Sequence, residues 1–414
     1  MCGVANTLPR RTANGQSRNS LRLAILATHP IQYHTPWYRG LAADGRLQVK
    51  VFYCHRATPG QQAEAGFGVP FEWDIPLLDG YEYEFLENVA SNPQTSSFSG
   101  LDVPGIYKSL GAEGFDAVLV NGWNHKACWQ TVWAAKRLGI PVLVRGDSHL
   151  HTPRSEAKSL VKDLAYPWML RLFDGYLSVG QWSREYYVHY GVPENQVFHV
   201  PHVIDEALFT KRDKGSYCTR EATRMKWNLP TEAIVFLFVG KFTALKNPTL
   251  FLDALRRSHG IQPNIAGFMV GDGPESRSCE VLAREWQVPV TLAGFINQTG
   301  LPEIFSASDV LVLPSAQETW GIVVNEAMWS GLPCIVSDQV GCGPDLIAGK
   351  GTGEVFPVGD HDALAQAMVQ FAGNAEYRRG CSARAKELIE QYSVSSAVEG
   401  TVQAVISVVK ESVR

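Results

Sequence analysis

Two carboxylates, Glu318 and Glu326, flank the start of a predicted helix in the second half of the chain. Backbone N–H groups at a helix start have no partner within the helix, so Trp320, Gly321 and Ile322 would present anion-binding donors between the two acids. The glycine removes a side chain where a ligand would approach the backbone. A nucleoside diphosphate sugar offers matching parts in the same order: sugar hydroxyls, diphosphate and ribose diol.

Two lysines in a second strand-to-helix turn are candidates for the same anion. Lys241 and Lys246 follow the apolar run 233–239, which is typical of a buried strand. A lysine binds phosphate as a point charge, and one turn would bring both cations near one anion. If they were only solvated side chains, they would lie where the helix dipole disfavours cations. The pair therefore favours a diphosphate site.

Polar side chains also follow two apolar runs in the first half. The run 21–27 is followed by His29, Gln32, Tyr33 and His34, and the run 140–145 by Asp147 and His149. Ligands of open α/β sheets bind at the carboxyl ends of the strands. We expect the first group to contact the acceptor or the donor in a cleft, with capping and packing of the loop as the alternative.

Apolar runs alternate with helical patterns in both halves, which predicts an α/β protein with two doubly wound, Rossmann-like domains. The expected division is a polar, disordered leader, an acceptor-side domain, a donor-side domain and a C-terminal helix, at residues 1–20, 21–205, 206–391 and 392–414. We expect the stretch 210–222 to be a linker and the entry to the second domain, and residues 360–391 to be helical.

The composition narrows the functional class. The 414 residues are 45% hydrophobic and 19% charged, with a net charge of −4, which gives no support for nucleic-acid binding. No apolar run approaches the ~20 residues of a membrane span. The eight cysteines form no C-x-x-C pair, which favours reduced thiols in a cytoplasmic protein. A location on the inner face of the membrane is the alternative.

The segment around the two glutamates resembles a known family signature. An apolar run at 310–313, Glu318-x7-Glu326 within E-x-x-G and N-E-A-M, and Gly331-Leu-Pro333 follow one another. This pattern is similar to that of retaining GT-B glycosyltransferases of family 4. The resemblance implies two Rossmann-like domains facing an interdomain cleft, with the last helix crossing back to the first domain. It also implies that Glu318 contacts the donor sugar and Glu326 the ribose.

Other segments extend the resemblance. Gly240-Lys241-x4-Lys246 is similar to the family's G-R-x4-K, with lysine in place of arginine, so the charge is kept and the bidentate fork is lost. The resemblance implies catalytic roles for Glu318, Lys241, Lys246, His149 and Asp147. It implies donor contacts at Gly240, Gly294, Phe295, Trp320, Gly321, Ile322 and Glu326. In the first half the family's glycine-rich loop is missing, and H-P-I-Q-Y-H resembles a bacterial subset.

The implied reaction moves a sugar from a nucleoside diphosphate sugar to a hydroxyl of a glycan, a glycolipid or a small molecule, with retention. Because the lysines can supply the charge of a metal and no metal-binding motif is visible, we expect neither a metal nor a cofactor. A GT-B sugar-nucleotide epimerase, a phosphorylase and a non-catalytic nucleotide-sugar-binding protein are the alternatives.

The segment 153–173 has two interpretations. It combines Arg154, Lys158, Lys162 and Arg171 with the apolar residues Leu160, Leu164, Trp168 and Leu170. We expect an amphipathic helix whose apolar side covers the sheet. The alternative is a docking surface for an anionic membrane or a lipid-linked acceptor. An irregular insertion also has two interpretations. Its aromatic residues could pack in the core or line an acceptor pocket; they are Phe67, Phe71, Trp73, Tyr81 and Tyr83.

Overall fold

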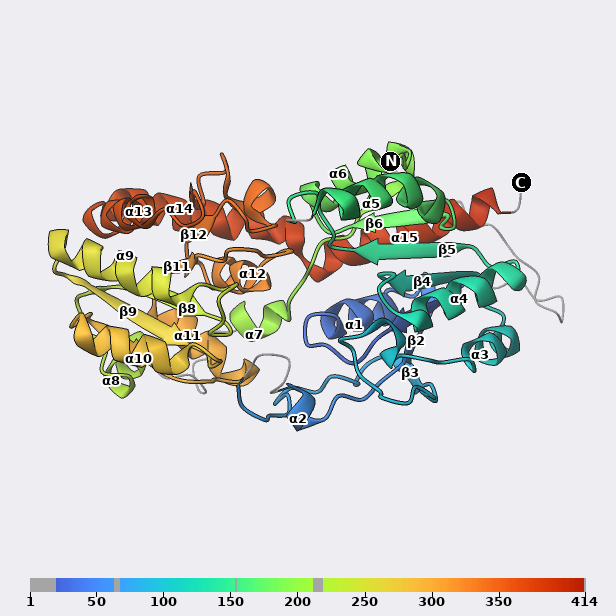
Figure 1. Cartoon of the computed structure of the whole chain (residues 1–414), viewed down its shortest axis with the longest axis horizontal. Helices are drawn as coiled ribbons and strands as arrows, with labels where there is room; N and C mark the ends of the chain where they lie inside the picture. Colours follow the sequence, from blue (N-terminus) through green and yellow to red (C-terminus); the bar gives the residue numbers. More distant parts are fainter. Residues whose placement is uncertain (1–19, 63–67, 153–154, 211–218, 413–414) are drawn as a thin grey trace.

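The structure, a computed structural model, describes residues 20–62, 68–152, 155–210 and 219–412. Two parallel sheets lie side by side along the long axis of the molecule, each with helices on both faces (Figure 1). The strand orders are β3-β2-β1-β4-β5-β6-β7 and β10-β9-β8-β11-β12-β13. This arrangement confirms the predicted fold class.

Most of the strands follow predicted apolar runs, but the strands at 82–85 and 353–356 were not predicted. The first sheet contains β1 (Leu21–Ala27), β2 (Leu47–Tyr53), β3 (Glu82–Phe85), β4 (Ala117–Asn121), β5 (Val142–Gly146), β6 (Gly175–Ser178) and β7 (Val197–His199). The second contains β8 (Ile234–Val239), β9 (Ile265–Val270), β10 (Val290–Leu292), β11 (Val310–Leu313), β12 (Cys334–Ser337) and β13 (Gly353–Phe356). Helices cover both faces of each sheet, so the central strands are continuously apolar instead of alternating.

The helices of the first half are α1 (Thr35–Asp44), α2 (Pro59–Gln62), α3 (Ile106–Glu113), α4 (Lys126–Arg137), α5 (Glu156–Leu170) and α6 (Gln181–His189). Those of the second half are α7 (Glu206–Thr210), α8 (Arg220–Lys226), α9 (Pro248–Ile261), α10 (Ser276–Glu285), α11 (Leu301–Ala307), α12 (Ile322–Trp329), α13 (His361–Gly373) and α14 (Ala375–Ile389). The last helix is α15 (Val394–Glu411). No helix in these described ranges has both the length and the apolar character needed to cross a bilayer.

Helix α15 leaves the second sheet and packs on the first, as the resemblance implied (Figure 1). The hydroxyl of Ser393 caps its start by accepting a hydrogen bond from the Ser396 N–H. Its valines, such as Val402 and Val405, share a core with residues of β1 and α1. The indole N–H of Trp37 donates to the Thr401 hydroxyl at 3.1 Å. The end of the chain is therefore part of the core of the first half.

The structure gives more detail for two expected segments. The helical region 360–391 contains two helices, because Asn374 interrupts it and its side chain caps α14 by accepting from the Tyr377 N–H. Helix α8 begins at Arg220, within the stretch expected to be linker and entry to the second domain. The expected leader, apart from Ser20, and residues 211–218 lie outside the described ranges.

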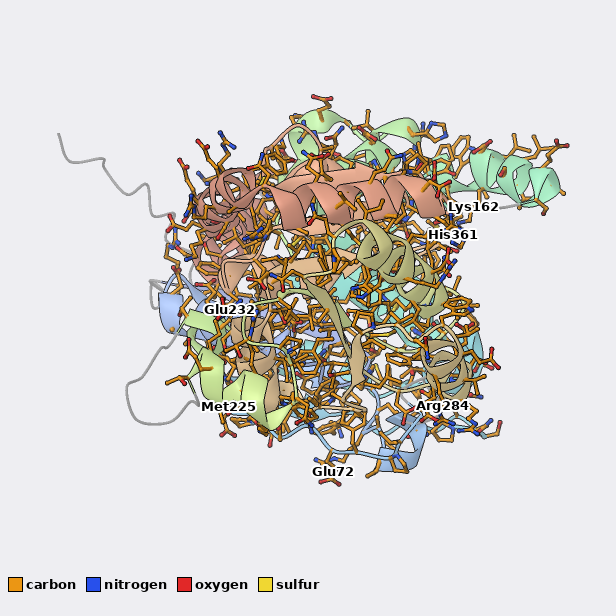
Figure 2. All side chains as sticks on the ribbon, turned by 90° about the vertical axis from the view of Figure 1, so that its left-hand side faces the viewer. Glu72, Lys162, Met225, Glu232, Arg284 and His361 are labelled. Carbon is orange, nitrogen blue, oxygen red and sulfur yellow. The ribbon has the colours of Figure 1, made fainter. Side chains whose placement is uncertain are left out.

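Helix α5 differs most from expectation. It is shorter than the predicted segment, and residues 153 and 154 lie outside the described ranges. Figure 2, in which Lys162 marks the helix, shows it standing out from the body of the molecule. Leu160, Leu164 and Trp168, which were expected to face the sheet, are exposed. The favoured prediction, an apolar side covering the sheet, is therefore wrong for these three residues.

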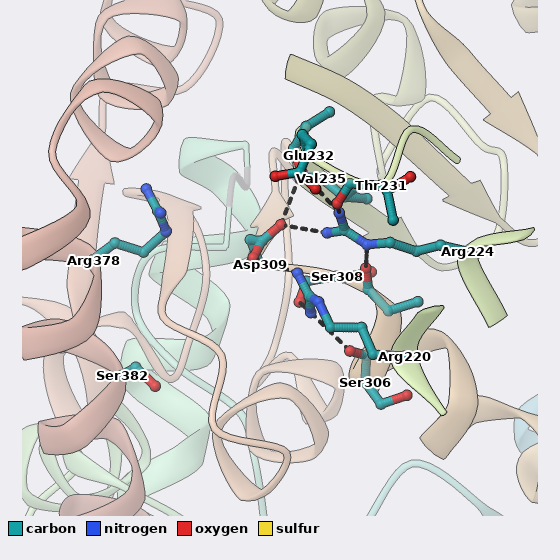
Figure 3. Close-up of polar contacts among 12 residues, drawn as sticks. Arg220, Arg224, Thr231, Glu232, Val235, Ser306, Ser308, Asp309, Arg378 and Ser382 are labelled. Carbon is teal, nitrogen blue, oxygen red and sulfur yellow. Dashed lines mark hydrogen bonds and ion pairs between the residues drawn. The ribbon is translucent and has the colours of Figure 1, made fainter. Parts of the chain in front are cut away.

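A polar cluster fastens α8 to the second sheet (Figure 3). The carboxylate of Asp309 accepts from Arg220 at 2.6 Å, from Arg224 at 2.8 Å and from the Val235 N–H at 2.8 Å. The Arg224 side chain is only 3% exposed and also donates to the Ala307 carbonyl oxygen at 2.9 Å. Because a buried guanidinium is costly without partners, this cluster requires its carboxylate.

Candidate functional site

The carboxyl ends of the two sheets meet at a cavity of about 510 Å³, called here the interdomain cleft. The loop after β1 contributes His29, Gln32 and Tyr33, and the turn after β8 contributes Lys241. Three of the four predicted cleft residues of the first half therefore share one cavity with a predicted diphosphate-binding lysine. Further lining residues are Pro30, Ile31, His55, Ala57, Gln61, Trp73 and residues 92–96.

The predicted catalytic residues of the second half lie together. The Lys246 ammonium forms an ion pair with the Glu318 carboxylate. Their loops are also joined by the backbone, since the Ala316 N–H donates to the Leu245 carbonyl oxygen at 2.8 Å. Glu318 itself donates its N–H to Gln339 and accepts from the Gly341 N–H, at 3.1 and 3.0 Å. The acid is thus held in place by both its backbone and its side chain.

The two lysines are partly buried cations that lie close enough to affect each other. Burial, followed by the positive charge of Lys241, lowers the pKa of Lys246 to about 8. A pKa of about 8 leaves most Lys246 side chains charged at neutral pH. Burial also lowers the pKa of Lys241. A bound anion would relieve both effects, which makes the pair suited to a diphosphate.

Gly321 starts α12 in a left-handed conformation, with φ of +98°. An added Cβ would lie 3.1 Å from side-chain atoms of both Leu313 and Val340. Glycine is therefore required here by the turn and by packing against the core. This is a different reason from the expected approach of a ligand to the backbone. The first turn of α12, beginning at Ile322, still presents its N–H groups at the helix start.

Glu326 lies in the middle of α12 and is only 6% exposed. In the described part of the chain its carboxylate has no hydrogen-bond or ion-pair partner. Burial raises its pKa to about 8. Because buried polar groups are normally hydrogen-bonded, an unpartnered carboxyl group at this place suits a ligand that supplies hydroxyls.

The turn with Gly294 and Phe295, which was predicted to contact the donor, contacts the first half of the chain. Gly294 accepts from the Gly271 N–H at 2.9 Å, and the Phe295 ring lies 4.5 Å from that of Phe71, centre to centre. Nearby, the Asn297 side chain donates to the Glu72 carbonyl oxygen at 2.7 Å. Residues 71–74 therefore bridge the two halves beside the cleft. At the turn after β8, Gly240 donates to the Val270 carbonyl oxygen at 3.0 Å.

The aromatic residues of the insertion divide between the two expected roles. Trp73 lines the cleft, whereas Tyr81 and Tyr83 pack with each other and with Tyr53 on the first sheet. Phe67 lies outside the described residues.

The Trp320 side chain connects the two halves and does not line the cleft. Its indole N–H donates to the Asn325 side-chain oxygen at 2.9 Å, and the Asn325 amide donates to the His202 carbonyl oxygen at 3.1 Å. The ring lies 5.7 Å from that of His202 and 5.9 Å from that of Tyr392. A donor contact by Trp320 would therefore have to use its backbone.

Two predicted histidines lie below the cleft surface. His34 is buried among Tyr33, Trp37 and Tyr38, and burial holds its pKa well below the usual value. His149 is buried with its ring 5.0 Å from that of Trp182. Neither is among the residues that line the cavity. Burial explains why His34 stays neutral at pH 7.

Three other residues of the first half are closer to the open space. Asp147 is partly buried, and its charge acts with burial to raise the pKa of Tyr33 to about 12. Burial, with smaller contributions from His55 and His125, lowers the pKa of His29 to about 4. The cleft therefore offers a neutral imidazole and a protonated phenol, both able to hydrogen-bond hydroxyls.

Sequence analysis missed Arg145, which is the last residue but one of β5. It is buried beneath the cleft, where its guanidinium donates to the Pro201 carbonyl oxygen at 3.1 Å and lies 4.8 Å from the centre of the Trp37 ring. Its charge contributes to the lowered pKa values of His34 and His202. The signal available in the sequence was an arginine inside an otherwise apolar strand.

Comparison with known proteins agrees with this geometry. A model named "Glycosyl transferases group 1" matches residues 219–388, and a "Glycosyl transferase 4-like domain" model matches residues 31–202. N-acetyl-alpha-D-glucosaminyl L-malate synthase of Bacillus anthracis is 26% identical over 48% of this chain and 51% of its own length. The chain spans about half the length of the first curated relatives it matches.

Two similarities extend over nearly the whole chain. D-inositol 3-phosphate glycosyltransferase of Stackebrandtia nassauensis is 25% identical over 95% of this chain and 93% of its own. The structure of Anabaena Alr3699/HepE in complex with UDP and glucose superposes with a TM-score of 0.68 at 15% identity, covering 92% of this chain and 98% of the other. Models of glycosyl transferase domains thus match both halves of this chain, and its fold is that of the GT-B glycosyltransferases.

Proposed function

We propose that the protein transfers a sugar from a nucleoside diphosphate sugar to a hydroxyl of its acceptor, with retention of the anomeric configuration. The observation that carries the proposal is the grouping of Lys241, Lys246 and Glu318 beside the start of α12, with the unpartnered carboxyl group of Glu326 further along that helix. These groups match the sugar, diphosphate and ribose of such a donor.

In the proposed complex the donor lies along α12. Glu318 contacts the sugar hydroxyls, and the two lysines with the N–H groups of the helix start hold the diphosphate. Glu326 contacts the ribose diol. The base lies against the turn at Gly294 and Phe295, near Gly240.

In the proposed reaction the bond between the anomeric carbon and the diphosphate oxygen breaks, and its electron pair leaves with the diphosphate. The acceptor oxygen bonds the same face of the sugar, and its proton passes to the leaving diphosphate. Lys241 and Lys246 stabilise the negative charge that develops there, which is where preorganised charge lowers a barrier most. Since these cations can do the work of a metal, we propose that the reaction needs none.

The acceptor enters from the first half of the chain. His29, Gln32 and Tyr33 line the cleft opposite Lys241 and would orient the attacking hydroxyl, while Asp147 and His149 would support the transferred sugar. The names of two relatives mention malate and inositol 3-phosphate, which are small compounds with hydroxyl groups and support an acceptor hydroxyl. The described cysteines are buried and unpaired, which supports a cytoplasmic location.

A donor panel tests the proposal. UDP-, GDP-, ADP- and dTDP-sugars are incubated with the purified protein, with and without EDTA, and release of nucleoside diphosphate is measured beside thermal shift. We expect slow hydrolysis of one donor, stabilisation by its diphosphate and no effect of EDTA. Loss of all turnover in EDTA would contradict metal independence.

The same panel separates the alternatives. A changed nucleotide sugar formed without acceptor would indicate an epimerase, and a requirement for inorganic phosphate would indicate a phosphorylase. Stabilisation by a donor that is never turned over, even with acceptors present, would indicate a binding protein. If no nucleotide stabilised the protein, the assignment of a donor site to Glu318 and Glu326 would be wrong.

A further inference from the structure

Helix α5 is held to the first half by one end. Leu170 belongs to the core there, and Tyr166 and Met169 pack against that core. The turns before Tyr166 extend beyond these anchors, and the helix stands out from the body in Figure 2. The helix therefore presents most of its length to the surroundings.

The outward side of α5 is apolar. Leu160, Val161, Leu164 and Trp168 are 62, 65, 68 and 70% exposed. With the exposed Ala157 and Ala165 they fall within an arc of about 140° on the helix at 3.6 residues per turn. These six residues are called here the apolar stripe. A continuous stripe of this kind, unlike single exposed apolar residues, is typical of a surface that contacts something else.

Basic side chains border the stripe. The Lys162 ammonium lies 4.8 Å from the centre of the Tyr166 ring, and the Arg171 guanidinium carbon lies 4.6 Å from that of Trp168. Residues 154–171 contain four basic and two acidic residues, whereas the chain has a net charge of −4. Apolar and aromatic side chains edged by cations are the pattern of a helix that lies in the interface of an anionic membrane.

Helix α5 is the next helix after β5 in the chain. Strand β5 ends at Gly146, where Asp147 follows, and α5 begins at Glu156. A helix that follows a parallel strand begins near the carboxyl end of that strand. In Figure 1 these strand ends of the first sheet point toward the second sheet. The free end of α5 is therefore the end near the cleft.

We propose that the apolar stripe of α5 docks the enzyme on an anionic membrane surface, so that the cleft receives an acceptor carried by a membrane lipid. The choice of acceptor rests on the proposed function, whereas the docking surface does not. A second copy of the chain is the competing occupant. Lys162 and Arg171, the described cations at the border of the stripe, favour an anionic surface over an identical helix, because two copies would bring these like charges together.

Vesicle sedimentation tests the docking. The full-length protein is mixed with vesicles of phosphatidylglycerol and phosphatidylethanolamine, or of phosphatidylcholine alone, and the bound fraction is measured. The test variants are Leu164→Glu and Trp168→Glu. The control is Met225→Glu, because Met225 is an apolar residue that is 76% exposed on α8, in the other half (Figure 2). All three sites are on the surface, so the variants should keep the melting temperature of the wild type.

We expect the wild type and Met225→Glu to bind anionic vesicles more strongly than phosphatidylcholine. Each α5 variant should lower the membrane partition coefficient about tenfold or more, since it removes one large apolar side chain that the bound state would bury in the membrane. Absence of sedimentation with any vesicle, or equal sedimentation of all variants, would overturn the proposal. So would a wild-type dimer that the α5 variants convert to monomers without changing vesicle binding.

Donor hydrolysis without vesicles separates this proposal from the proposed function. The α5 variants should hydrolyse the donor at the wild-type rate, because α5 does not line the cleft. If vesicles bind through α5 but no donor is hydrolysed, the docking surface stands and the proposed reaction fails. If the donor is hydrolysed but the vesicles are not bound, the docking proposal alone fails.

Discussion

At the scale of single residues, the candidate site is built from charged groups whose burial is costly. Lys246 pairs with Glu318, and burial lowers the pKa of both Lys241 and Lys246. Glu326 is a buried acid without a partner in the described chain. Each of these features costs free energy in the protein without a ligand, and a bound donor would reduce that cost. Such groups are common at functional sites because binding compensates their cost.

Glu318→Gln should separate turnover from affinity. The change removes the acceptor of sugar hydroxyls and leaves both lysines free for the diphosphate. We expect donor turnover to fall about a hundredfold or more, while the affinity for the bare nucleoside diphosphate stays equal or rises. Isothermal titration and donor hydrolysis measure the two effects. Glu280→Gln, in an exposed ion pair with Arg277, is the control. An equal loss of both quantities would refute the sugar-contacting role.

Glu326→Gln should change stability in a manner that depends on pH. The folded carboxyl group keeps its proton to about pH 8, whereas the ordinary value is 4.5. The folded state therefore binds more protons between these values, so the contribution of Glu326 to stability falls as pH rises through that window. Gln cannot ionise and avoids this loss.

We expect the melting temperature of Glu326→Gln to exceed that of the wild type by about 2–5 °C at pH 8.5 and to match it at pH 4.5. Scanning calorimetry at both pH values measures the difference. At pH 8.5 the variant should also bind the nucleoside diphosphate more weakly. A constant difference in melting temperature at the two pH values would show that the carboxyl group is not buried as described.

At the scale of elements, strand-to-helix turns position the site and polar clusters fasten the helices around it. The turn after β8 and the loop after β11 are joined by one backbone hydrogen bond and one ion pair. Helix α8, at the edge of the same sheet, depends on Asp309 in the cluster of Figure 3. Short helices have little stability of their own, so such contacts decide whether they form.

Asp309→Ala should destabilise the second half strongly. The change leaves the buried Arg224 without a carboxylate and removes the acceptor of the Val235 N–H. We expect a loss of about 3–5 kcal/mol in the free energy of unfolding, measured by urea denaturation. Glu303→Ala, which breaks the more exposed pair with Lys226, should cost about 1 kcal/mol or less. Equal losses in the two variants would contradict the structural role of the Asp309 cluster.

At the scale of the whole molecule, the two halves are connected by contacts that come from distant parts of the chain. Asp345 accepts from the Gln181 N–H at 3.0 Å and from the Tyr392 hydroxyl at 3.1 Å, so the start of α6 is tied to the second half. Helix α15 completes the core of the first half. The core of the first half therefore depends on a helix that follows the second half in the chain.

Gly400→Ala should loosen the attachment of α15. A Cβ at this position would lie 2.0 Å from the His199 carbonyl oxygen, so the helix would have to move away from β7. We expect the melting temperature to fall by several degrees, by differential scanning fluorimetry. Gly380→Ala, in α14, is the matched control, because its Cβ would meet only an Arg384 nitrogen at 3.8 Å. If both variants had the same melting temperature, the close contact of α15 with β7 would not be needed for stability.

The sequence by itself determined most of the strands, the alternating α/β order and the segments that hold the candidate donor site. Continuous apolar runs and Glu318-x7-Glu326 are local patterns, and local patterns are visible without a structure. The pairing of Lys246 with Glu318, the burial of Arg145 and the exposure of the α5 stripe were decided only by the tertiary structure. The spacing of residues shows which side chains share one side of a helix. It does not show whether a sheet covers that side, because the covering element comes from elsewhere in the chain.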